Sequence, residues 1–496
     1  MKYLLGYDIG SSSVKAALLE IQSGNCVASA FSPESEMTID SPAAGFAEQD
    51  PEIWWQELIA ATKKLQKEFS YKAEEVAAIG ISYQMHGLVC LDKKGKVLRP
   101  AIIWCDSRAV DIGNNAYQKI GTAYCQQHLL NSPGNFTASK LKWVKESEPE
   151  VYKQIDSIAL PGDYIAFKLT GEKNTTTSGL SEGIFWDFAE EKISKNLLDH
   201  YGFDPHLIPP TVPQFGMQGA ITKDAAALLH LKEGTPVTYR AGDQPNNAFS
   251  LNVLQPGEIA ATAGTSGVVY GVTDSIHSDP ASRVNTFLHV THSKKNPRYG
   301  ILLCINGTGI LNSWVRKNFF GGARYEELNA EAATVPIGSE GILCYPFGNG
   351  AERVLKNFDP GAAIEGIRFN SHSRAHVARA VQEGIVFSLH YGIGIMKELG
   401  LSLTTVRAGY ANMFLSKVFA EAFANTTGAR LELYNTDGAI GAARAAGVGH
   451  GAYANFRDGF AGMEKVQEID PDLKKQQAYG EAYEKWREGL RKKTGL

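Results

Sequence analysis

Close to its start the chain reads Gly6-Tyr7-Asp8-Ile9-Gly10-Ser11-Ser12-Ser13-Val14-Lys15 and continues with the apolar run Ala16-Ala17-Leu18-Leu19. A second copy of this pattern lies half a chain away, in Ala261-Thr262-Ala263-Gly264-Thr265-Ser266-Gly267 followed by Val268-Val269-Tyr270. Each copy predicts a strand, a tight turn and a second strand. Glycines let the backbone approach an anion closely, and hydroxyl and amide groups supply hydrogen-bond donors. Two such turns indicate a duplicated domain that holds one polyphosphate from both sides.

The length of the chain also favours two domains. With 496 residues it is too long for a single hydrophobic core. We expect the boundary near Asn252–Gly257, which gives an N-terminal domain over 1–250 and a C-terminal domain over 251–496. Within the latter, residues 451–496 are interpreted as a peripheral tail.

Composition and charge exclude several classes of partner. A net charge of −4 gives no general attraction to nucleic acid or to an acidic membrane surface. No apolar run is long enough for a signal-peptide core or a membrane span, so we expect a cytoplasmic protein. The six cysteines form no CxxC pair, and most lie in apolar runs, which predicts buried free thiols rather than a metal site.

Strands and helices are predicted to alternate along the chain, which indicates an α/β fold with mixed sheets. Asp50-Pro51-Glu52 is a good start for a helix that continues to about Phe69. Further expected elements are strands over 3–9, 14–21, 76–82, 301–305 and 406–409, a strand pair formed by 87–92 and 102–104, helices over 376–399 and 412–424, and a small-residue helix capped by Asp437.

Asp243 is the first candidate for catalysis. It follows the expected strand Pro236-Val237-Thr238-Tyr239 and lies between Gly242 and Gln244. A carboxylate at the C-terminal end of a strand can point into a cleft, where it could accept a proton from a hydroxyl group that attacks phosphorus. The alternative is that Asp243 caps the next helix.

Asp8 directly precedes the first phosphate-type turn. A carboxylate there repels phosphate unless a cation intervenes, and Mg²⁺ favours carboxylates together with substrate phosphates. We therefore predict that Asp8 orients Mg²⁺, with Asp243 as a second metal contact. The alternative is an aspartate that only shapes the turn. From the same turn, the predicted phosphate-binding residues are Gly10, Ser11, Ser12 and Lys15.

Two strand ends carry polar groups suited to a small polyol. Gln84-Met85-His86-Gly87 follows one of them, and a histidine can both donate hydrogen bonds to hydroxyl groups and accept them. Trp104-Cys105-Asp106-Ser107-Arg108 follows another, where Trp104 and Asp106 are candidates. The alternatives are a His86 with protein partners in a turn and an internal salt bridge of Asp106.

In the second half, Ala408-Gly409-Tyr410-Ala411-Asn412 joins a strand to a helix. Such a small-residue turn could admit adenine or ribose near helix N-terminal donors. Trp314, which follows Asn306-Gly307-Thr308-Gly309, could cover a base, although a core tryptophan is the simpler interpretation. The predicted nucleotide-binding residues here are Gly264, Thr265, Gly307, Trp314, Ala408, Gly409 and Asn412.

Taken together and in this order, the motifs resemble the FGGY carbohydrate kinases, within the superfamily of sugar kinases, actin and heat-shock ATPases. The resemblance runs from Gly6 to about Gly447 and includes Asp437-Gly438-Ala439-Ile440-Gly441-Ala442-Ala443. Within the family, the Met85-His86 pair is typical of kinases that act on xylulose.

This resemblance implies two ribonuclease-H-like domains hinged around a cleft, with ATP mostly on the second domain. It implies that Asp243 is the general base and that Met85 and His86 contact a ketopentose. Asp8, Gly264, Thr265 and residues 408–412 would surround Mg-ATP. A homodimer is typical of similar kinases.

The sequence departs from the family pattern at two positions. Gln244 stands where the family usually has Asn. The residue at this position commonly contacts the sugar in the family, so the resemblance implies that Gln244 is a further substrate-binding residue. Ala408 replaces the first of two glycines in the adenosine motif. Our hypothesis is ATP-dependent phosphorylation of D-xylulose to D-xylulose 5-phosphate. Because of Gln244, L-xylulose, ribulose, glycerol or another small polyol remains an alternative acceptor. A non-catalytic, nucleotide-dependent sugar sensor is a third possibility.

Overall fold

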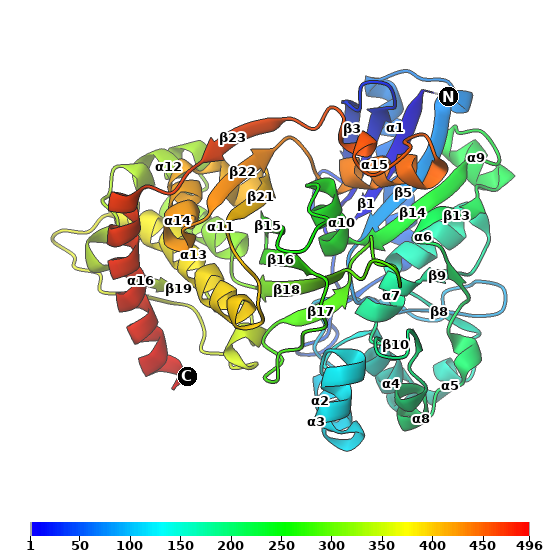
Figure 1. Ribbon diagram of the computed structural model, residues 1–496, viewed down its shortest axis with the longest axis horizontal. Coiled ribbons are helices and arrows are strands. Elements are labelled where there is room, and N and C mark those ends of the chain that lie inside the picture. Colours follow the sequence, from blue (N-terminus) through cyan, green and yellow to red (C-terminus); the bar gives the residue numbers. More distant parts are fainter. Residues whose placement is uncertain (1, 496) are drawn as a thin grey trace. The chain divides into compact units, whose positions relative to one another are not determined.

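A computed structural model describes residues 2–495, which form two compact units (Figure 1). The first unit contains the chain up to Asn252, together with Phe287–Arg298 and Thr436–Met463. The second contains Val253–Thr286, Tyr299–Asn435 and the chain from Glu464 onward. The first boundary therefore lies where the sequence indicated, but the units differ from the predicted halves because two later segments return to the first unit.

The first unit is built on a mixed six-stranded sheet. The strand order is β13 (Phe215–Ala220), β14 (Pro236–Gly242), β5 (Val76–Tyr83), β1 (Tyr3–Ile9), β2 (Val14–Glu20) and β3 (Cys26–Ser32). Strands β14, β5 and β1 run parallel to one another, and the remaining neighbours are antiparallel. The predicted hairpin of β1 and β2 is confirmed, with Asp8 opposite Lys15 in its register.

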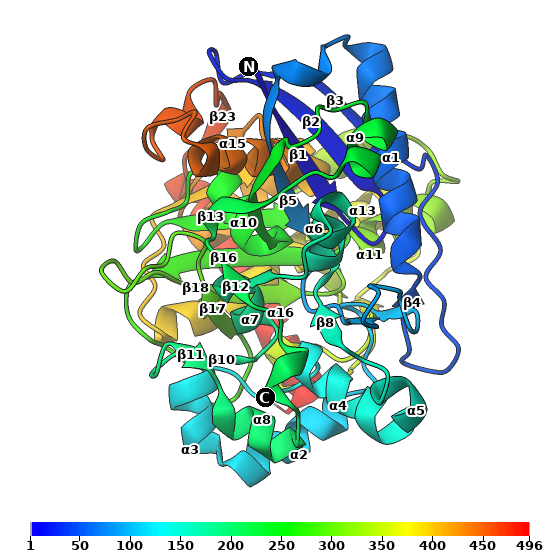
Figure 2. The same ribbon diagram turned by 90° about the vertical axis from the view of Figure 1, so that its right-hand side faces the viewer.

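Helices cover both faces of this sheet (Figure 2). Successive residues of β1 point to opposite faces. The hydroxyl group of Tyr7 lies 2.8 Å from that of Thr62 on α1 (Pro51–Glu68), which begins at Pro51 as predicted and is capped by Asp50. Gly6 faces α15 (Gly438–His450) instead. The first unit also contains α2 (Val110–Ile120), α4 (Thr137–Ser147), α6 (Pro161–Thr170), α7 (Thr177–Glu182), α8 (Lys195–Tyr201), α9 (Lys223–Leu229) and α10 (Asp243–Ser250).

Helix α15 lies directly on the backbone of β1 and β5. A Cβ atom at Gly6 would overlap the carbonyl oxygen of Ala439, and one at Gly80 would overlap that of Ala442. Nine of the thirteen residues of the helix are glycine or alanine, and the two residues that meet Gly6 and Gly80 are the alanines Ala439 and Ala442. This packing is why the segment from Thr436 belongs to the first unit, although it comes late in the chain.

The second unit repeats the same sheet pattern. Its strand order is β17 (Asn285–Leu288), β18 (Tyr299–Ile305), β16 (Gly267–Thr273), β15 (Ile259–Ala263), β21 (Thr405–Gly409), β22 (Arg430–Tyr434) and β23 (Lys465–Ile469). The hairpin of β15 and β16 corresponds to that of β1 and β2, and β21 and β22 add in parallel, as β5 and β14 do. The predicted duplication is thus visible in the topology. The helices are α11 (Gly309–Phe319), α12 (Tyr325–Ala333), α13 (Arg374–Glu398), α14 (Lys417–Thr427) and α16 (Leu473–Thr494).

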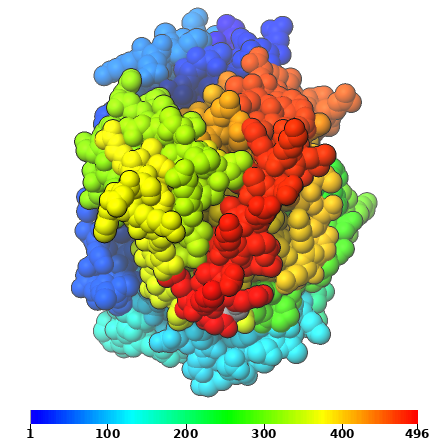
Figure 3. Space-filling view, turned by 90° about the vertical axis from the view of Figure 1, so that its left-hand side faces the viewer, coloured from blue at the N-terminus to red at the C-terminus, as the bar shows by residue number. Residues whose placement is uncertain are grey.

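The prediction of a peripheral tail over 451–496 is wrong. Strand β23 pairs with β22, and α16 lies across an outer face of the second unit (Figure 3). One side of α16 is part of the core: Trp486 is fully buried, and its indole N–H donates a 2.7 Å hydrogen bond to the carbonyl oxygen of Cys344. The many charged residues of α16 concealed this apolar side in the sequence.

Three smaller expectations also need correction. The strands β6 (Val89–Leu91) and β7 (Ala101–Ile102) do not form the predicted pair, because each is paired with a different strand. A single bridge, between Leu88 just before β6 and Ile102 of β7, connects the two segments. The helix expected over 412–424 is divided at Ser416, which caps α14 with its side chain. All six cysteines are free, but only Cys90, Cys125 and Cys344 are buried. Among residues 2–495, no helix has the length and apolar character needed to cross a membrane.

Gly80→Ala is expected to destabilise the protein by about 3 kcal/mol, because the added methyl group forces α15 away from β5. The free energy of unfolding in urea measures this effect. Gly394→Ala is the matched control: it lies in α13 with open space around its Cβ position, so it should be neutral or stabilising by up to about 1 kcal/mol. Equal stabilities of the Gly80→Ala variant and the wild type would contradict the proposed role of this contact.

Candidate active site

The parallel strands of the first unit bring the predicted acidic residues together. In the sheet, Asp8 of β1 is opposite Ser82 of β5, and Tyr83 is opposite Gly242 of β14. The C-terminal ends of these strands therefore lie at one edge, which is where ligands bind in sheets of this kind. The hydroxyl group of Ser82 donates a 2.7 Å hydrogen bond to Oδ1 of Asp8 and fixes that carboxylate.

Asp243 is the first residue of α10, directly after β14. Gly242 occupies the capping position, so the alternative that Asp243 itself caps this helix is wrong. The side-chain amide of Gln244 donates a 3.1 Å hydrogen bond to Oδ2 of Asp243. Burial raises the pKa of Asp243 to about 7, and the negative charge of Asp8 acts in the same direction. A carboxyl group with this pKa is suited to accept a proton near neutral pH.

The first turn is tied to the start of α15. Lys15 forms an ion pair with Asp437, whose other oxygen caps α15 by accepting a 2.9 Å hydrogen bond from the backbone N–H of Ile440. Burial raises the pKa of Asp8, and the nearby Asp437 contributes to the shift. Asp8, Asp243 and Asp437 thus concentrate negative charge, with Lys15 as the neighbouring cation.

The turn between β1 and β2 carries the predicted phosphate-binding residues. Its backbone closes through a 3.0 Å hydrogen bond from the N–H of Gly10 to the carbonyl oxygen of Ser13. Ser11 and Ser12 lie between these two residues. The indole N–H of Trp104 donates a 3.3 Å hydrogen bond to the hydroxyl oxygen of Ser11. Trp104, a predicted substrate contact, is therefore in direct contact with the turn that is predicted to bind phosphate.

Gln84, Met85 and His86 follow β5, and Met85 lies beside Gly242, the residue before Asp243. A Cβ atom added at Gly242 would be 2.6 Å from Cγ of Met85. Gln84 is buried, and neither end of its side-chain amide has a hydrogen-bond partner within residues 2–495. His86 has a positive φ of 62°, and its Nδ1 lies 3.0 Å from the carbonyl oxygen of Glu182.

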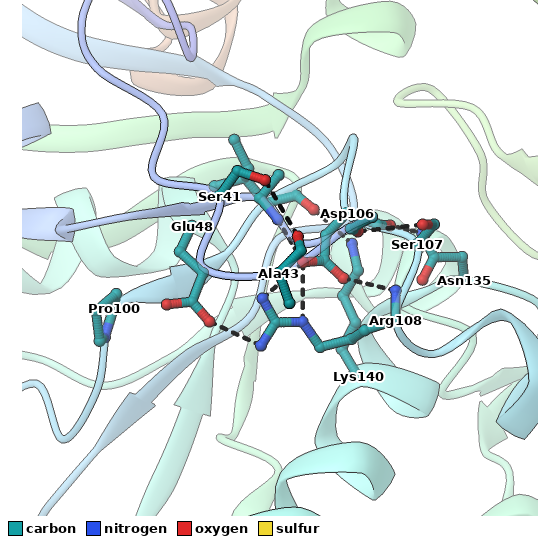
Figure 4. Close-up of polar contacts among 12 residues, drawn as sticks. Ser41, Ala43, Glu48, Pro100, Asp106, Ser107, Arg108, Asn135 and Lys140 are labelled. Carbon is teal, nitrogen blue, oxygen red and sulfur yellow. Dashed lines mark hydrogen bonds and ion pairs between the residues drawn. The ribbon is translucent and has the colours of Figure 1, made fainter. Parts of the chain in front are cut away.

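Asp106 belongs to a buried ionic network, as the internal salt-bridge alternative proposed (Figure 4). Its carboxylate accepts a 2.6 Å hydrogen bond from the N–H of Ala47 and is 2.7 Å from a guanidinium nitrogen of Arg108. Arg108 in turn contacts Glu48 at 2.7 Å. These partners favour a structural role over the predicted contact with substrate.

Lys140 is a residue of this region that the sequence analysis missed. Its ammonium group donates hydrogen bonds of 2.9 and 2.8 Å to the carbonyl oxygens of His86 and Ile103. Burial lowers the pKa of Lys140 to about 8, although the charge of Asp106 opposes this shift. Lys140 thereby joins the two loops that carry His86 and Trp104. No motif marks it, because its role depends on backbone groups that are distant in sequence.

In the second unit, the predicted nucleotide residues are also close together. The N–H of Gly309 donates a 2.9 Å hydrogen bond to the carbonyl oxygen of Gly264, and the N–H of Ile310 donates one of 3.2 Å to that of Thr265. A Cβ atom at Gly264 would lie 3.7 Å from the side-chain nitrogen of Asn412, which has a positive φ of 53°.

The other residues of this group lie at its margins. Gly307 leaves no room for a side chain, because a Cβ atom there would overlap the carbonyl oxygen of Pro346. Ala408 is buried at the end of β21, next to Gly409. Trp314 is 51% exposed on α11, so the interpretation as a core tryptophan is wrong. Glu352, which the sequence analysis missed, accepts a 3.0 Å hydrogen bond from the N–H of Asn306 and holds this loop.

Across residues 2–495, no group of three or more histidine, cysteine, aspartate or glutamate side chains has the arrangement of a protein-only metal site. The acidic residues Asp8 and Asp243 still suit Mg²⁺, because this ion is commonly held by one or two carboxylates together with substrate phosphates and water. The unbalanced negative charge around Asp8 is what a divalent cation would neutralise.

Comparison with known proteins identifies the architecture. Residues 3–250 match the model of the N-terminal domain of the FGGY family of carbohydrate kinases, and residues 259–450 match that of its C-terminal domain. Xylulose kinase of Bacillus subtilis (strain 168) is 31% identical over 469 residues, which cover 92% of this chain and 90% of the relative. L-xylulose/3-keto-L-gulonate kinase of Escherichia coli (strain K12) is 29% identical over 500 aligned residues, covering 98% and 96%. The crystal structure of xylulose kinase from Rhodospirillum rubrum has a TM-score of 0.84 at 27% identity, covering 99% of this chain and 98% of that one.

Asp8→Asn is expected to lower the pKa of Asp243, because it removes the neighbouring negative charge that disfavours ionisation. A ¹³C NMR titration of the Asp243 carboxyl group measures this shift. Asp40→Asn, which makes the same charge change at an exposed position, should leave that pKa unchanged. An Asp243 pKa that is the same in the Asp8→Asn variant would show that the two carboxylates do not interact.

Proposed function

Because the chain belongs to the FGGY family of carbohydrate kinases, we propose that it transfers the γ-phosphate of ATP to D-xylulose and yields D-xylulose 5-phosphate. The chain is an ATP-dependent sugar kinase with the two-domain fold of this family. The identity of the sugar and the role of each residue are the proposal. One observation carries the catalytic part: Asp243 lies at the strand edge beside Asp8, with its pKa raised to about 7.

In the proposed reaction, Asp243 accepts the proton of the terminal hydroxyl group of the sugar. The oxygen of that hydroxyl forms a bond to the γ-phosphorus as the bond to the β–γ bridging oxygen breaks, and ADP leaves. Such a reaction needs little covalent chemistry from the protein, which contributes mainly positioning and charge stabilisation. At pH 7 about half of a group with a pKa of 7 is ionised and can act as a base.

The acceptor is assigned to the residues around Asp243. Gln84 and Gln244 each have a buried side-chain amide atom without a hydrogen-bond partner among the described residues. A polyol can satisfy such atoms, because each of its hydroxyl groups both donates and accepts. Met85, His86 and Trp104 complete this set, and Asp106 supports it through Arg108 rather than by touching the sugar.

ATP is assigned to the two turns. In the first unit, the residues assigned to phosphate oxygens are Gly10, Ser11, Ser12 and Lys15. In the second unit, Gly264 and Thr265 are assigned to phosphate. Gly307, Trp314, Ala408, Gly409 and Asn412 would surround the adenosine. Asp8 and Asp243 would hold Mg²⁺, which when bound neutralises phosphate charge. A homodimer and a cytoplasmic location, suggested by typical kinases of this kind and by the six free cysteines, are part of the same proposal.

L-xylulose is the second candidate acceptor. A kinase named for that sugar and for 3-keto-L-gulonate is 29% identical to the chain. Gln244, which donates to Asp243, also departs from the usual residue of the family at this position. Other relatives are named xylulose kinases, which supports xylulose as the acceptor.

Asp243→Asn should reduce kcat with D-xylulose by roughly 10²–10⁴-fold, because the amide cannot accept the proton. Binding of ATP, measured by calorimetry, should be retained. The raised folded-state pKa means that the ionised carboxylate lowers stability above pH 7. The variant should therefore have a higher Tm than the wild type at pH 8, and this difference should shrink as the pH falls below 7. Near-wild-type turnover would refute the assignment of Asp243 as the base.

A panel of acceptors tests the substrate. With coupled detection of ADP, kcat/KM should be highest for D-xylulose and lower for L-xylulose, D-ribulose and glycerol. Because Asp243 must be ionised to act, kcat/KM should rise with pH up to about 7 and then level off. Equal values for glycerol and D-xylulose would contradict the assignment of the sugar. ATP binding without ADP release on any acceptor would instead indicate a sugar sensor.

A further inference from the structure

Glu182, the last residue of α7, is a buried carboxyl group that the mechanism above does not use. It is 2% exposed. The hydroxyl group of Tyr83 and the backbone N–H of His86 lie near its carboxyl group, but within residues 2–495 neither carboxyl oxygen has a hydrogen bond of good geometry. A buried polar group without a partner is costly, and native proteins contain few of them. An apolar side chain of the same size would stabilise the folded protein more at this position. Packing alone therefore does not explain the carboxyl group.

The surroundings of Glu182 are the residues that we assign to the acceptor. A Cβ atom at Gly242 would lie 2.8 Å from Oε2 of Glu182 and 2.6 Å from Cγ of Met85, so both side chains flank the residue that precedes Asp243. The carbonyl oxygen of Glu182 is 3.0 Å from Nδ1 of His86. Burial raises the pKa of Glu182 well above its ordinary range, and the charge of Asp243 adds to this shift.

We propose that the carboxyl group of Glu182 hydrogen-bonds a hydroxyl group of the acceptor other than the one that is phosphorylated, and so favours five-carbon acceptors over glycerol. The inference rests on the proposed function, because it assumes that the hydroxyl group that is phosphorylated lies next to Asp243. Gln84 supports it by analogy: this residue is equally buried at 4% exposure, and its amide atoms are equally without partners.

The chemistry of the acceptor fits this role. A ketopentose carries several hydroxyl groups along its chain, and each can donate to a carboxyl oxygen or accept from a protonated carboxyl group. Glycerol is shorter than a ketopentose. When its terminal hydroxyl group faces Asp243, it has fewer remaining hydroxyl groups that could reach Glu182. A site built to hydrogen-bond a substrate hydroxyl discriminates strongly against a substrate that lacks it.

The test compares Glu182→Met and Glu182→Gln with the wild type. Glu182→Met should raise Tm, because it removes a buried carboxyl group that loses its hydration on folding, yet lower kcat/KM for D-xylulose by about tenfold or more, chiefly through KM. The loss for glycerol should be less than about twofold. Glu182→Gln, which keeps hydrogen-bonding atoms, should recover most of the activity on D-xylulose.

Thr426→Val in α14 is the matched control. The hydroxyl group of Thr426 is also buried and without a partner among the described residues, but it lies in the second unit. This variant should be as stable as the wild type or more so, with unchanged kcat/KM on every acceptor. A Glu182→Met variant that keeps wild-type kcat/KM on D-xylulose, or that loses the same factor on glycerol, would overturn the proposal.

A binding measurement separates this inference from the proposed function and does not depend on turnover. The ¹³Cδ resonance of Glu182, assigned by its absence in Glu182→Gln, should move when D-xylulose is added without ATP. Glycerol should not move it. A resonance that D-xylulose leaves in place would overturn the role of Glu182, whereas a shift in a protein that releases no ADP would support it and refute only the kinase reaction on this sugar.

Discussion

The contact of α15 with the backbone of β1 and β5 is the constraint on which the first unit depends. Gly6 and Gly80 have no side chains that would separate the strands from the helix. The glycine and alanine residues of α15 allow its backbone to pack closely against them. Because the helix touches the sheet itself, its N-terminus has little freedom to shift. Asp437 is thereby placed where it meets Lys15 and influences Asp8. A purely steric arrangement thus determines the charge pattern at the strand edge.

The cluster of carboxyl groups at the strand edge lowers the stability of the folded protein, but it also shifts their pKa values toward neutral pH. Burial raises the free-energy cost of ionising Asp8 and Asp243. The charge of Asp437 adds to the cost for Asp8, and the charge of Asp8 adds to the cost for Asp243. Groups with shifted pKa values of this kind gather at active sites, where a base must change protonation near neutral pH. The surrounding structure supplies the rigidity that holds them: Ser82 fixes Asp8, and α10 starts at Asp243. The turn of the second unit has Thr262 and Ala263 before Gly264, so the two hairpins share their topology but not the acidic residue.

The sequence predicted the features that are local. Both hairpins, the start of α1 at Pro51 and the cap at Asp437 follow from turn and capping residues within a few positions. It did not predict that α16 belongs to the core, since only one side of a highly charged helix is apolar. Lys140 and Glu182 were also missed, because their importance arises from backbone carbonyls and glycines far away in the chain. For Asp106, the sequence left two roles open, and only the arrangement of Arg108 and Glu48 distinguishes them.

The late position of α15 in the chain has a consequence for biosynthesis. During translation, residues up to Asn252 emerge from the ribosome long before Gly438 is made. Until then the glycine-bearing face of β1 and β5 has no helix to cover it, and the nascent sheet exposes backbone and apolar surface. Pairing segments so distant in sequence is slow, and exposed strand surfaces invite aggregation. The first unit can therefore complete its fold only after Gly438–His450 has been made, and until then it depends on avoiding aggregation.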